Sequence, residues 1–492
     1  MTPEPMSLSR ADWRGLLGAS PPRNWPEVLT GLQPDSRRIR PGWIFVAIRG
    51  TVADGHDFVT DAARRGASGV VADSEVHGAG GVPVIVVPDA RVALAKLSLA
   101  LFRRPDHRLR ITGVTGTNGK TSVTGFLRQF QEAAGIRTGL LGTVSYSFGE
   151  REIPARRTTP GAPELQEYLH SMVEAGCTDC VMEVSSHALH QHRVAGMALD
   201  TAVFTNLSRD HLDYHNDMDS YFEAKSRLFD TPGLRTRIVG EDVWSGRIAE
   251  RFPDVLRCGL GDGCEVRAEI VETHLSGTVA KLDTPWGRGE VRVPVPGEHN
   301  LRNALQAFAG AAAHGMSFED LLSAAERLKP APGRLQSVPS SRGRILVDYA
   351  HTPDALENVL RTLRPLTRGR LIVVFGCGGD RDRSKRPLMT QAAAGADELI
   401  LTTDNPRTED PDRIFEDMLD GVEVTPPHAV VPDRREAIAR GVACLEADDV
   451  LLIAGKGHET MQECGSVRMP FDDREVAAAL ARERDGVVKG GR

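Results

Sequence analysis

Hydrophobic residues along this chain gather in short runs rich in β-branched side chains, and longer amphipathic segments separate several of these runs. Such runs, bounded by glycine, proline or polar residues, are typical of buried β-strands. Amphipathic patterns at 121–135 and 353–363 follow two of them and predict helices. The alternation predicts βαβ units, and hence an α/β fold with mainly parallel sheets covered by helices. The strand-like runs are 108–114, 179–184, 344–350, 370–376, 398–403 and 449–455.

Two joints rich in proline, glycine and charged residues interrupt this pattern. One is FRRPDHRLR around Pro105, and the other is LKPAPGRLQSV, which precedes a fresh strand-like run. A chain of 492 residues is too long for one ordinary core, and at ~150 residues per domain it has room for about three domains. We therefore predict domains at 1–106, 107–333 and 334–492.

Charge and cysteine content exclude several classes of protein. The formal net charge of −7 and the pI near 6.1 give no general attraction to nucleic acid or to an anionic membrane. Seven scattered cysteines do not suit a disulfide framework, and Cys177 and Cys180, although spaced like zinc ligands, are interpreted as packing residues. There is no signal-peptide pattern and no apolar run of the ~18 residues that a membrane span needs. We expect a cytoplasmic monomer with no nucleic-acid or membrane partner.

The polar stretch VTGTNGKTSV, residues 114–123, follows a predicted strand and opens a predicted helix. This is the context of a phosphate-binding loop, in which backbone N–H groups and a helix N-terminus point at phosphate oxygens. Lys120 can bridge the β- and γ-phosphates of a nucleotide, and the hydroxyl of Thr121 can bind Mg²⁺. Val114 stands where the usual pattern has its first glycine. A glycine-rich turn with an incidental lysine is the alternative, and the loop alone does not choose between a kinase, an ATPase and a ligase.

Two further strand-like runs end in polar groups that suit a metal bound beside the phosphates. Glu183 lies at the end of one run, and a buried glutamate is rare without a partner, so it is a candidate Mg²⁺ ligand. The other run ends at Asn206 and is followed by His211 and, on a helical segment, by Lys225. The absence of cysteine here favours Mg²⁺ over Zn²⁺. Two alternatives remain open: Glu183 could pair with an arginine, and Lys225 could be a solvated cation.

Nine motifs, in order along the chain, resemble those of the Mur ligases, whose phosphate loop also has the form TGTNGKT. The match as a whole runs from about Asp35 to Asp473, which is nearly the whole chain. Within the family they are most similar to the branch that adds 2,6-diaminopimelate to UDP-N-acetylmuramoyl-L-alanyl-D-glutamate. The motifs are VTGTNGKTS, MEVSSHALHQHRV, TNLSRDHLDYH with FEAKSRLF, GEHNLRNALQA, APGRLQ, DYAHTPDAL, FGCGGDRDRSKRPLM, TTDNPRTED and AGKGHE.

This resemblance implies an ATP-dependent, amide-forming ligase that works through an acyl phosphate. It implies an N-terminal α/β domain that binds the UDP precursor, a central P-loop ATPase and a C-terminal Rossmann-like domain that binds the amino acid. The expected substrates are the UDP-linked dipeptide, meso-diaminopimelate and ATP. The expected role is cytoplasmic peptidoglycan precursor synthesis, and through it cell wall biogenesis, cell shape and the cell division cycle.

The resemblance also implies two Mg²⁺ ions and a carbamate, formed from CO₂, on Lys225. The new carboxylate would bind the second Mg²⁺ together with His211. An ammonium would repel that ion, whereas a carbamate offers the hard oxygen that it prefers. The implied catalytic residues are Lys120, Glu183, His211 and Lys225, and the metal ligands are Thr121, Glu183, His211 and the carbamate. The implied ATP-binding residues are Gly116, Thr117, Asn118, Gly119, Lys120, Thr121, Ser122, Asn300, Asn303, Arg334 and Asp348.

The segment from Asp35 to Phe58 resembles the uridine-nucleotide site of the family. Close relatives often have asparagine where this chain has Arg157, so a contact from that position is in doubt. The residues implied for the UDP precursor are Ser36, Thr51, Val52 and Ala53, with Thr158, Thr159, Ser185, Gln191 and Arg193 for the muramoyl dipeptide.

The motif TTDNPRTED contains Pro406 and therefore predicts a fixed turn. By resemblance it forms the diaminopimelate pocket, in which the planar guanidinium of Arg407 meets the far carboxylate with two parallel bonds. Lysine lacks that carboxylate, so it would leave Arg407 unpaired. A solvated loop arginine is the alternative. The residues implied for this pocket are Arg381, Asp404, Asn405, Pro406, Arg407, Gly455 and Glu459.

Three other functions compete with this reading. A lysine-adding ligase shares the chemistry but has no use for Arg407. A folylpolyglutamate synthase-like ligase shares the ATPase core but does not account for the N-terminal segment. A nucleotide-binding regulator without activity would have no need of Lys225, His211 and Glu183 together.

Overall fold

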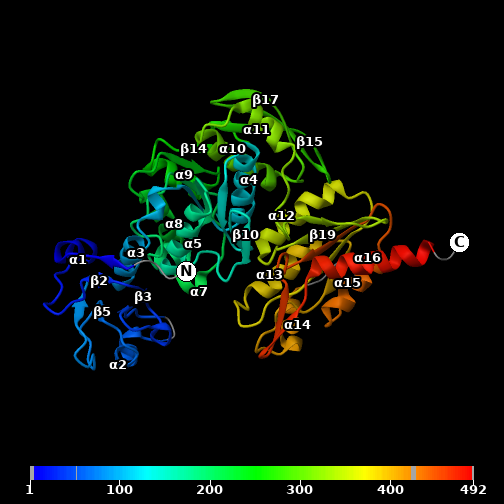
Figure 1. The fold of residues 1–492 in the computed structure, drawn as a ribbon. Coiled ribbons are helices and arrows are strands. Elements are labelled where there is room, and N and C mark those ends of the chain that lie inside the picture. The colour runs from blue at the N-terminus through cyan, green and yellow to red at the C-terminus, as the bar shows by residue number, and fades with distance from the viewer. Residues whose placement is uncertain (1–4, 51–52, 423–427, 490–492) are drawn as a thin grey trace. The chain divides into compact units, whose positions relative to one another are not determined.

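The structure is a computed structural model that describes residues 5–50, 53–422 and 428–489 (Figure 1). The chain divides into two compact units. Unit 1 comprises residues 1–116, 135–204 and 219–237, and unit 2 comprises residues 117–134, 205–218 and 238–492. Among the helices of the described ranges, none combines the length and the apolar character that a membrane span requires.

The first hundred residues, within unit 1, form a small α/β layer. Four short strands pair in parallel in chain order, and the central strand residues Ile44, Phe45 and Val46 are fully buried. Trp13 packs edge-to-face on Trp25, with 5.5 Å between ring centroids. The elements are β1 (Met6–Ser7), α1 (Arg10–Leu17), β2 (Val28–Leu29), β3 (Leu32–Gln33), β4 (Ile44–Val46), α2 (Val59–Arg64), β5 (Gly69–Ala72), β6 (Val84–Val86) and α3 (Ala90–Leu101).

The rest of unit 1 is built on strands in the order β10-β9-β8-β11-β7-β12. The four strands from β8 to β12 in this order are parallel, so their carboxyl ends meet at one edge, where ligands bind in such sheets. The register aligns Glu183 with Val114 and so brings the carboxylate to the edge where the phosphate loop begins. The elements are β7 (Arg110–Thr115), β8 (Thr138–Leu141), β9 (Ser145–Phe148), β10 (Arg151–Pro154), α5 (Ala162–Glu174), β11 (Asp179–Glu183), α6 (Ser186–His190), β12 (Thr201–Phe204) and α8 (Met218–Ser226).

Unit 2 begins with the phosphate loop and the helix that follows it. This helix, α4 (Lys120–Ala133), packs on α10 (Glu298–Ala313), and Phe130 meets Phe308 edge-to-face with ring centroids 6.1 Å apart. Strand β13 (Thr236–Val239) begins in the last segment of unit 1 and ends in unit 2. The remaining elements of this part are α7 (Leu212–His215), α9 (Val243–Arg251), β14 (Leu256–Gly259), β15 (Val266–His274), β16 (Gly277–Thr284), β17 (Gly287–Val293) and α11 (Phe318–Ala325).

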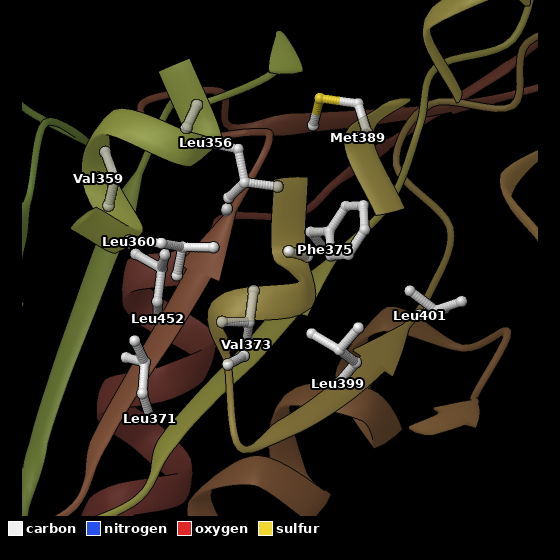
Figure 2. Packing of buried hydrophobic residues seen from close by; sticks show 14 of the residues in the cluster. Leu356, Val359, Leu360, Leu371, Val373, Phe375, Met389, Leu399, Leu401 and Leu452 are labelled. Atoms are coloured by element: carbon white, nitrogen blue, oxygen red, sulfur yellow. The ribbon is translucent and has the colours of Figure 1, made fainter. Parts of the chain in front are cut away.

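The C-terminal part of unit 2 is a doubly covered sheet with the order β18-β19-β23-β20-β21-β22. Side chains alternate along β20, so Leu371, Val373 and Phe375 pack on one face while Ile372 and Val374 pack on the other. Figure 2 shows the first face, where α12 and α13 cover the sheet. The elements are β18 (Gln336–Val338), β19 (Arg344–Asp348), α12 (Pro353–Leu363), β20 (Leu371–Phe375), α13 (Lys385–Ala392), β21 (Glu398–Leu401), α14 (Pro411–Leu419), β22 (His428–Val430), α15 (Arg434–Ala443), β23 (Val450–Ala454), β24 (Met461–Cys464), β25 (Val467–Pro470) and α16 (Asp473–Lys489).

The predicted α/β class with mainly parallel sheets is confirmed, and each predicted strand-like run contains a strand. The predicted helices at 121–135 and 353–363 correspond to α4 and α12. The interpretation of Cys177 and Cys180 as packing residues is also confirmed, because both are buried. The sequence pattern did not single out the antiparallel strands β9 and β10, nor the antiparallel meander β15–β17.

Candidate active site

The phosphate loop of unit 2 is held by the segment that begins at Thr205. Asn206 accepts the backbone N–H of Thr117 at its carbonyl (2.9 Å) and that of Asn118 at its side-chain oxygen (3.0 Å). The carbonyl of Asn118 accepts the hydroxyl of Thr205 (2.6 Å) and the amide of Asn206 (3.1 Å). A second link joins the Thr117 hydroxyl to Ser208. The loop is therefore shaped by protein contacts before any ligand binds.

The loop leads directly into the first turn of α4. Gly119 precedes the helix with a φ of 87°, a left-handed conformation that suits glycine, and a Cβ there would lie 2.4 Å from Oδ1 of Asn303. Lys120 donates its ammonium to the carbonyl of Thr117 (2.8 Å), and Arg334 lies 3.4 Å from the hydroxyl of Thr121. A helix N-terminus with a lysine and an arginine beside it suits a polyphosphate.

A cavity of about 780 Å³ opens beside this loop within unit 2. Its size is that of a pocket for a nucleotide-sized ligand. Seven residues implied for ATP line it together: Asn118, Gly119, Ser122, Asn300, Asn303, Arg334 and Asp348. The lining also includes residues that the sequence reasoning did not assign to ATP, among them Asn206, Glu241, His299, Arg302 and Asp354. Asp354 accepts a hydrogen bond from the Asn118 amide at 3.0 Å, although 236 positions separate the two residues.

Burial and the positive charge of Arg334 both shift the pKa values of two groups near this arginine, Asp348 and His458. Burial raises the pKa of Asp348, while Arg334 and hydrogen bonds from the backbone N–H groups of Leu335 (2.6 Å) and Ala350 (2.8 Å) oppose the rise. Burial lowers the pKa of His458 to about 3, and Arg334 contributes in the same direction. The imidazole of His458 is therefore neutral at pH 7, so it does not compete with Arg334 for an anion.

In unit 1, the Glu183 carboxylate at the end of β11 accepts hydrogen bonds from Thr143, which lies in the hairpin between β8 and β9. Thr143 donates its backbone N–H to Oε1 (2.8 Å) and its hydroxyl to Oε2 (2.9 Å). The same hydroxyl lies 3.1 Å from that of Thr158, one of the residues implied for the dipeptide. Glu183 is buried, with 1% of its surface exposed, so its two oxygens have a fixed direction.

Lys225 lies on α8 of unit 1 and is buried, with only 1% of its surface exposed. Its Nζ donates to the carbonyl of Gly116, the first glycine of the phosphate loop, at 2.7 Å, and lies 4.5 Å from the ring centroid of Tyr221. The alternative that Lys225 is a solvated cation is therefore wrong. The role of a carbamate on Lys225 as a Mg²⁺ ligand stays a prediction.

The donors implied for Mg²⁺ are chemically suitable, with one condition. The carboxylate of Glu183 and the hydroxyl of Thr121 are hard oxygen donors, whereas Lys225 fits a cation only as a carbamate. Across the described ranges, no group of three or more His, Cys, Asp and Glu side chains forms a ready metal cluster. A carbamate on Lys225 would add a carboxylate oxygen to the hard donors of Glu183 and Thr121.

His211 stands at the start of α7 with a left-handed φ of 54°, and its Nε2 lies 3.4 Å from Asp210. Burial works to raise the pKa of Asp210, but the positive charge of His211 acts against it. His351 and Lys385 act in the same direction. The pKa of Asp210 is thus lowered, which keeps a negative charge beside His211.

The residues implied for the muramoyl dipeptide form one network in unit 1. Thr159 donates its hydroxyl to the carbonyl of Glu183 (2.9 Å) and accepts the N–H of Ser185 (3.0 Å). Arg193 donates to the carbonyl of Thr159 (2.7 Å) and to the side chain of Gln191 (2.8 Å).

At the edge of this network, the backbone N–H of Arg157 donates to the Tyr146 hydroxyl (3.1 Å). Of the implied uridine contacts, Ser36 is buried and Ala53 is exposed. Thr51 and Val52 lie outside the described residues.

The residues implied for diaminopimelate gather at the carboxyl ends of β20, β21 and β23. Arg407 has a left-handed φ of 51° and donates to the carbonyl of Gly379 at 2.6 Å, with its Nε 3.4 Å from Glu463. Gly455 has a φ of 109°, and a Cβ there would lie 2.7 Å from Oδ2 of Asp404. The side chain of Arg381, by contrast, donates to the neighbouring carbonyl of Asp380.

Gly119→Ala is expected to raise the KM for ATP by about tenfold or more, because the new methyl group would displace Asn303 and strain the loop. Gly125→Ala is the matched control, because a Cβ at this position of α4 meets nothing closer than Ala331 at 3.9 Å. Steady-state kinetics at varied ATP measure both. Equal KM values for the two variants would contradict a role of the Gly119 turn in nucleotide binding.

Three family models match consecutive parts of the chain. They are the Mur ligase family catalytic domain over residues 28–101, the Mur ligase middle domain over 114–311 and the Mur ligase glutamate ligase domain over 333–457. Together they cover well over half of the sequence.

Individual relatives agree with these models. The UDP-N-acetylmuramoyl-L-alanyl-D-glutamate–2,6-diaminopimelate ligase of Geobacillus kaustophilus is 43% identical over 93% of this chain and 96% of its own. The enzyme of the same name from Gloeobacter violaceus is 43% identical over 94% of this chain and 96% of its own. A solved structure of a ligase of this name is 35% identical, with a TM-score of 0.70 over 98% of this chain and 100% of that one. The chain therefore belongs to the Mur ligase family and has its three-domain α/β architecture.

Proposed function

We propose that this chain is an ATP-dependent ligase that adds meso-2,6-diaminopimelate to UDP-N-acetylmuramoyl-L-alanyl-D-glutamate in peptidoglycan precursor synthesis. The observation that carries this proposal is the 43% identity, over 93% of the chain, to a ligase named for this reaction. The phosphate loop and the adjoining cavity support the use of ATP.

The chemistry follows from the poor reactivity of a carboxylate, whose leaving group would be oxide. The side-chain carboxylate of D-glutamate attacks the γ-phosphorus of ATP, the bond from this phosphorus to the β–γ bridging oxygen breaks, and ADP leaves an acyl phosphate behind. The amine of diaminopimelate then attacks the carbonyl carbon, and phosphate leaves as the amide forms. Lys120 and the backbone N–H groups of the loop would stabilise the charge of the transferring phosphoryl group.

The proposed metal ligands are the four residues that the family resemblance implies. Thr121 and Glu183 would hold the Mg²⁺ of the nucleotide, and His211 with the carbamate of Lys225 would hold a second ion. Bound Mg²⁺ supplies charge neutralisation at the phosphate oxygens. Glu183 is prepared for this role by the two hydrogen bonds from Thr143, which orient its carboxylate.

The proposed selection of the amino acid depends on Arg407. Its Nη1 donates to Gly379 and its Nε faces Glu463. Within the described part of the chain its Nη2 donates no hydrogen bond, so this nitrogen can meet a ligand carboxylate. Diaminopimelate has such a carboxylate at its far end, whereas lysine does not. Sites built for a polar group reject analogues without it by about 10⁴-fold.

We further propose that residues 1–106 bind the UDP moiety, 107–333 bind ATP and 334–492 bind the amino acid. The network of Thr158, Thr159, Ser185, Gln191 and Arg193 would meet the dipeptide. We expect a cytoplasmic monomer.

ATP-dependent phosphate release tests the proposal. Release should require the UDP-linked dipeptide together with diaminopimelate, and lysine at the same concentration should support less than about 1% of the rate. Release with lysine and not with diaminopimelate would identify the lysine-adding reaction. Release with a folate substrate instead would identify the folylpolyglutamate reaction, and no release with any pair would refute a ligase.

A further inference from the structure

Lys456 lies between β23 and β24 and is fully buried, with 0% of its side chain exposed. A buried ammonium is costly unless acceptors meet its protons. Its Nζ donates to the carbonyl of Met461 (2.7 Å), to Oδ1 of Asn405 (3.1 Å) and to Oε2 of Glu459 (3.1 Å). Three protons therefore meet three acceptors, which fixes the amine in one place.

Two of these acceptors, Asn405 and Glu459, belong to the segments 404–407 and 455–459, which are expected to bind the amino acid. Asn405 is fixed on both sides of its amide, because Oδ1 also accepts the N–H of Glu463 (3.0 Å) and Nδ2 donates to Glu459 (2.8 Å). Both hydrogen bonds to Glu459 fall on Oε2. Within the described ranges Oε1 accepts no hydrogen bond, and the side chain is 32% exposed, so this oxygen is available to a ligand.

We propose that Lys456 is a positioning residue for the amino-acid substrate. By holding Oε2 of Glu459 and the amide of Asn405, it directs Oε1 of Glu459 toward the ammonium group of an incoming diamino acid. This inference rests on the proposed function, in which the segments 404–407 and 455–459 bind diaminopimelate. Lys456 itself does not touch the substrate and acts through Glu459 and Asn405.

Lys456→Met tests this role because methionine keeps an unbranched chain of similar length and removes all three donors. We expect the KM for diaminopimelate to rise about 30-fold, since the Glu459 carboxylate loses a charge-assisted hydrogen bond and its fixed direction. The values of kcat and of the KM for ATP and for the UDP-linked dipeptide should change less than about threefold. Steady-state phosphate release at varied concentrations of each substrate measures all four quantities.

Arg370→Met is the matched control. Arg370 also donates to a carboxylate, of Asp449 (2.7 Å), and to a backbone carbonyl, of Cys444, but it lies at the opposite end of the same sheet. It should lower thermal stability without a selective change in the KM for diaminopimelate. If both variants raise the KM values for diaminopimelate, ATP and the UDP-linked dipeptide alike, Lys456 has only a structural role and the proposal is overturned.

A double-mutant cycle with Glu459→Gln provides a second measurement. Because Lys456 acts through that carboxylate, Lys456→Met should raise the KM less than about threefold in the Glu459→Gln background. A full 30-fold rise there would overturn the proposal. If Lys456→Met does not fold, Lys456→Gln, which retains donors, enters the same cycle with a smaller expected rise. Wild-type protein that releases no phosphate with diaminopimelate would refute the proposed function itself, whatever the variants do.

Discussion

Lys225→Ala is expected to lower kcat by about 10³-fold or more, which corresponds to ~4 kcal/mol of transition-state stabilisation. The side chain is buried and its Nζ lies 2.7 Å from the carbonyl of Gly116. Alanine therefore leaves a space beside Gly116 and removes the amine on which the carbamate would form. If the carbamate is the working group, added formate or acetate should raise the rate of the Lys225→Ala variant at least about tenfold. Phosphate release with and without these anions measures both effects.

Lys225→Arg is a second test, because arginine keeps the positive charge but its protonated guanidinium does not form a carbamate with CO₂ at neutral pH. It should be as inactive as the alanine variant. Lys281→Ala removes an exposed lysine of β16 and should leave the rate unchanged. Activity in Lys225→Arg, or rescue of Lys225→Ala by methylamine in place of acetate, would show that a cation is required and would refute the carbamate.

Arg407→Lys is expected to raise the KM for diaminopimelate about 10²-fold while the KM for ATP changes little. The ammonium of the introduced lysine side chain is a point charge, so it cannot make the two parallel hydrogen bonds that a guanidinium makes with a carboxylate. It would also lose the bond to the carbonyl of Gly379 (2.6 Å), which holds the present side chain over the turn. Separate titrations of the two substrates in the phosphate-release assay measure this selectivity.

Arg413→Lys is the control for this substitution, since Arg413 is an exposed arginine of the neighbouring helix α14. It should behave as wild type. The discrimination against lysine should also narrow in Arg407→Lys, because diaminopimelate loses the paired hydrogen bonds that lysine, without a far carboxylate, cannot make. An equal rise in KM for ATP and diaminopimelate, or unchanged discrimination, would contradict the assignment of Arg407 as the specificity residue.

Local patterns in the sequence were sufficient for the fold class and for the position of the phosphate loop. A buried parallel strand reads as a continuous apolar run and a surface helix as a periodic one, so Arg110–Thr115 and Lys120–Ala133 could be placed without tertiary information. The polar residues that follow such strands meet at one edge of the sheet, which is why Glu183 was a candidate from its position alone. The strands β15, β16 and β17 were not predicted, because buried and exposed residues alternate along much of these half-exposed strands and form no continuous apolar run.

The tertiary structure decided what depends on contacts between distant residues. Lys225 and Lys456 look like ordinary lysines in the sequence, and only the packing shows that both are buried with acceptors in place. The link between Asn118 and Asp354 likewise joins segments 236 positions apart. Burial and hydrogen-bond partners are properties of the assembled chain, because neighbours along the sequence do not determine which surfaces lose contact with water. The sequence by itself thus determined the class of fold and the residue types at the site, and the tertiary structure alone decided how those residues are held.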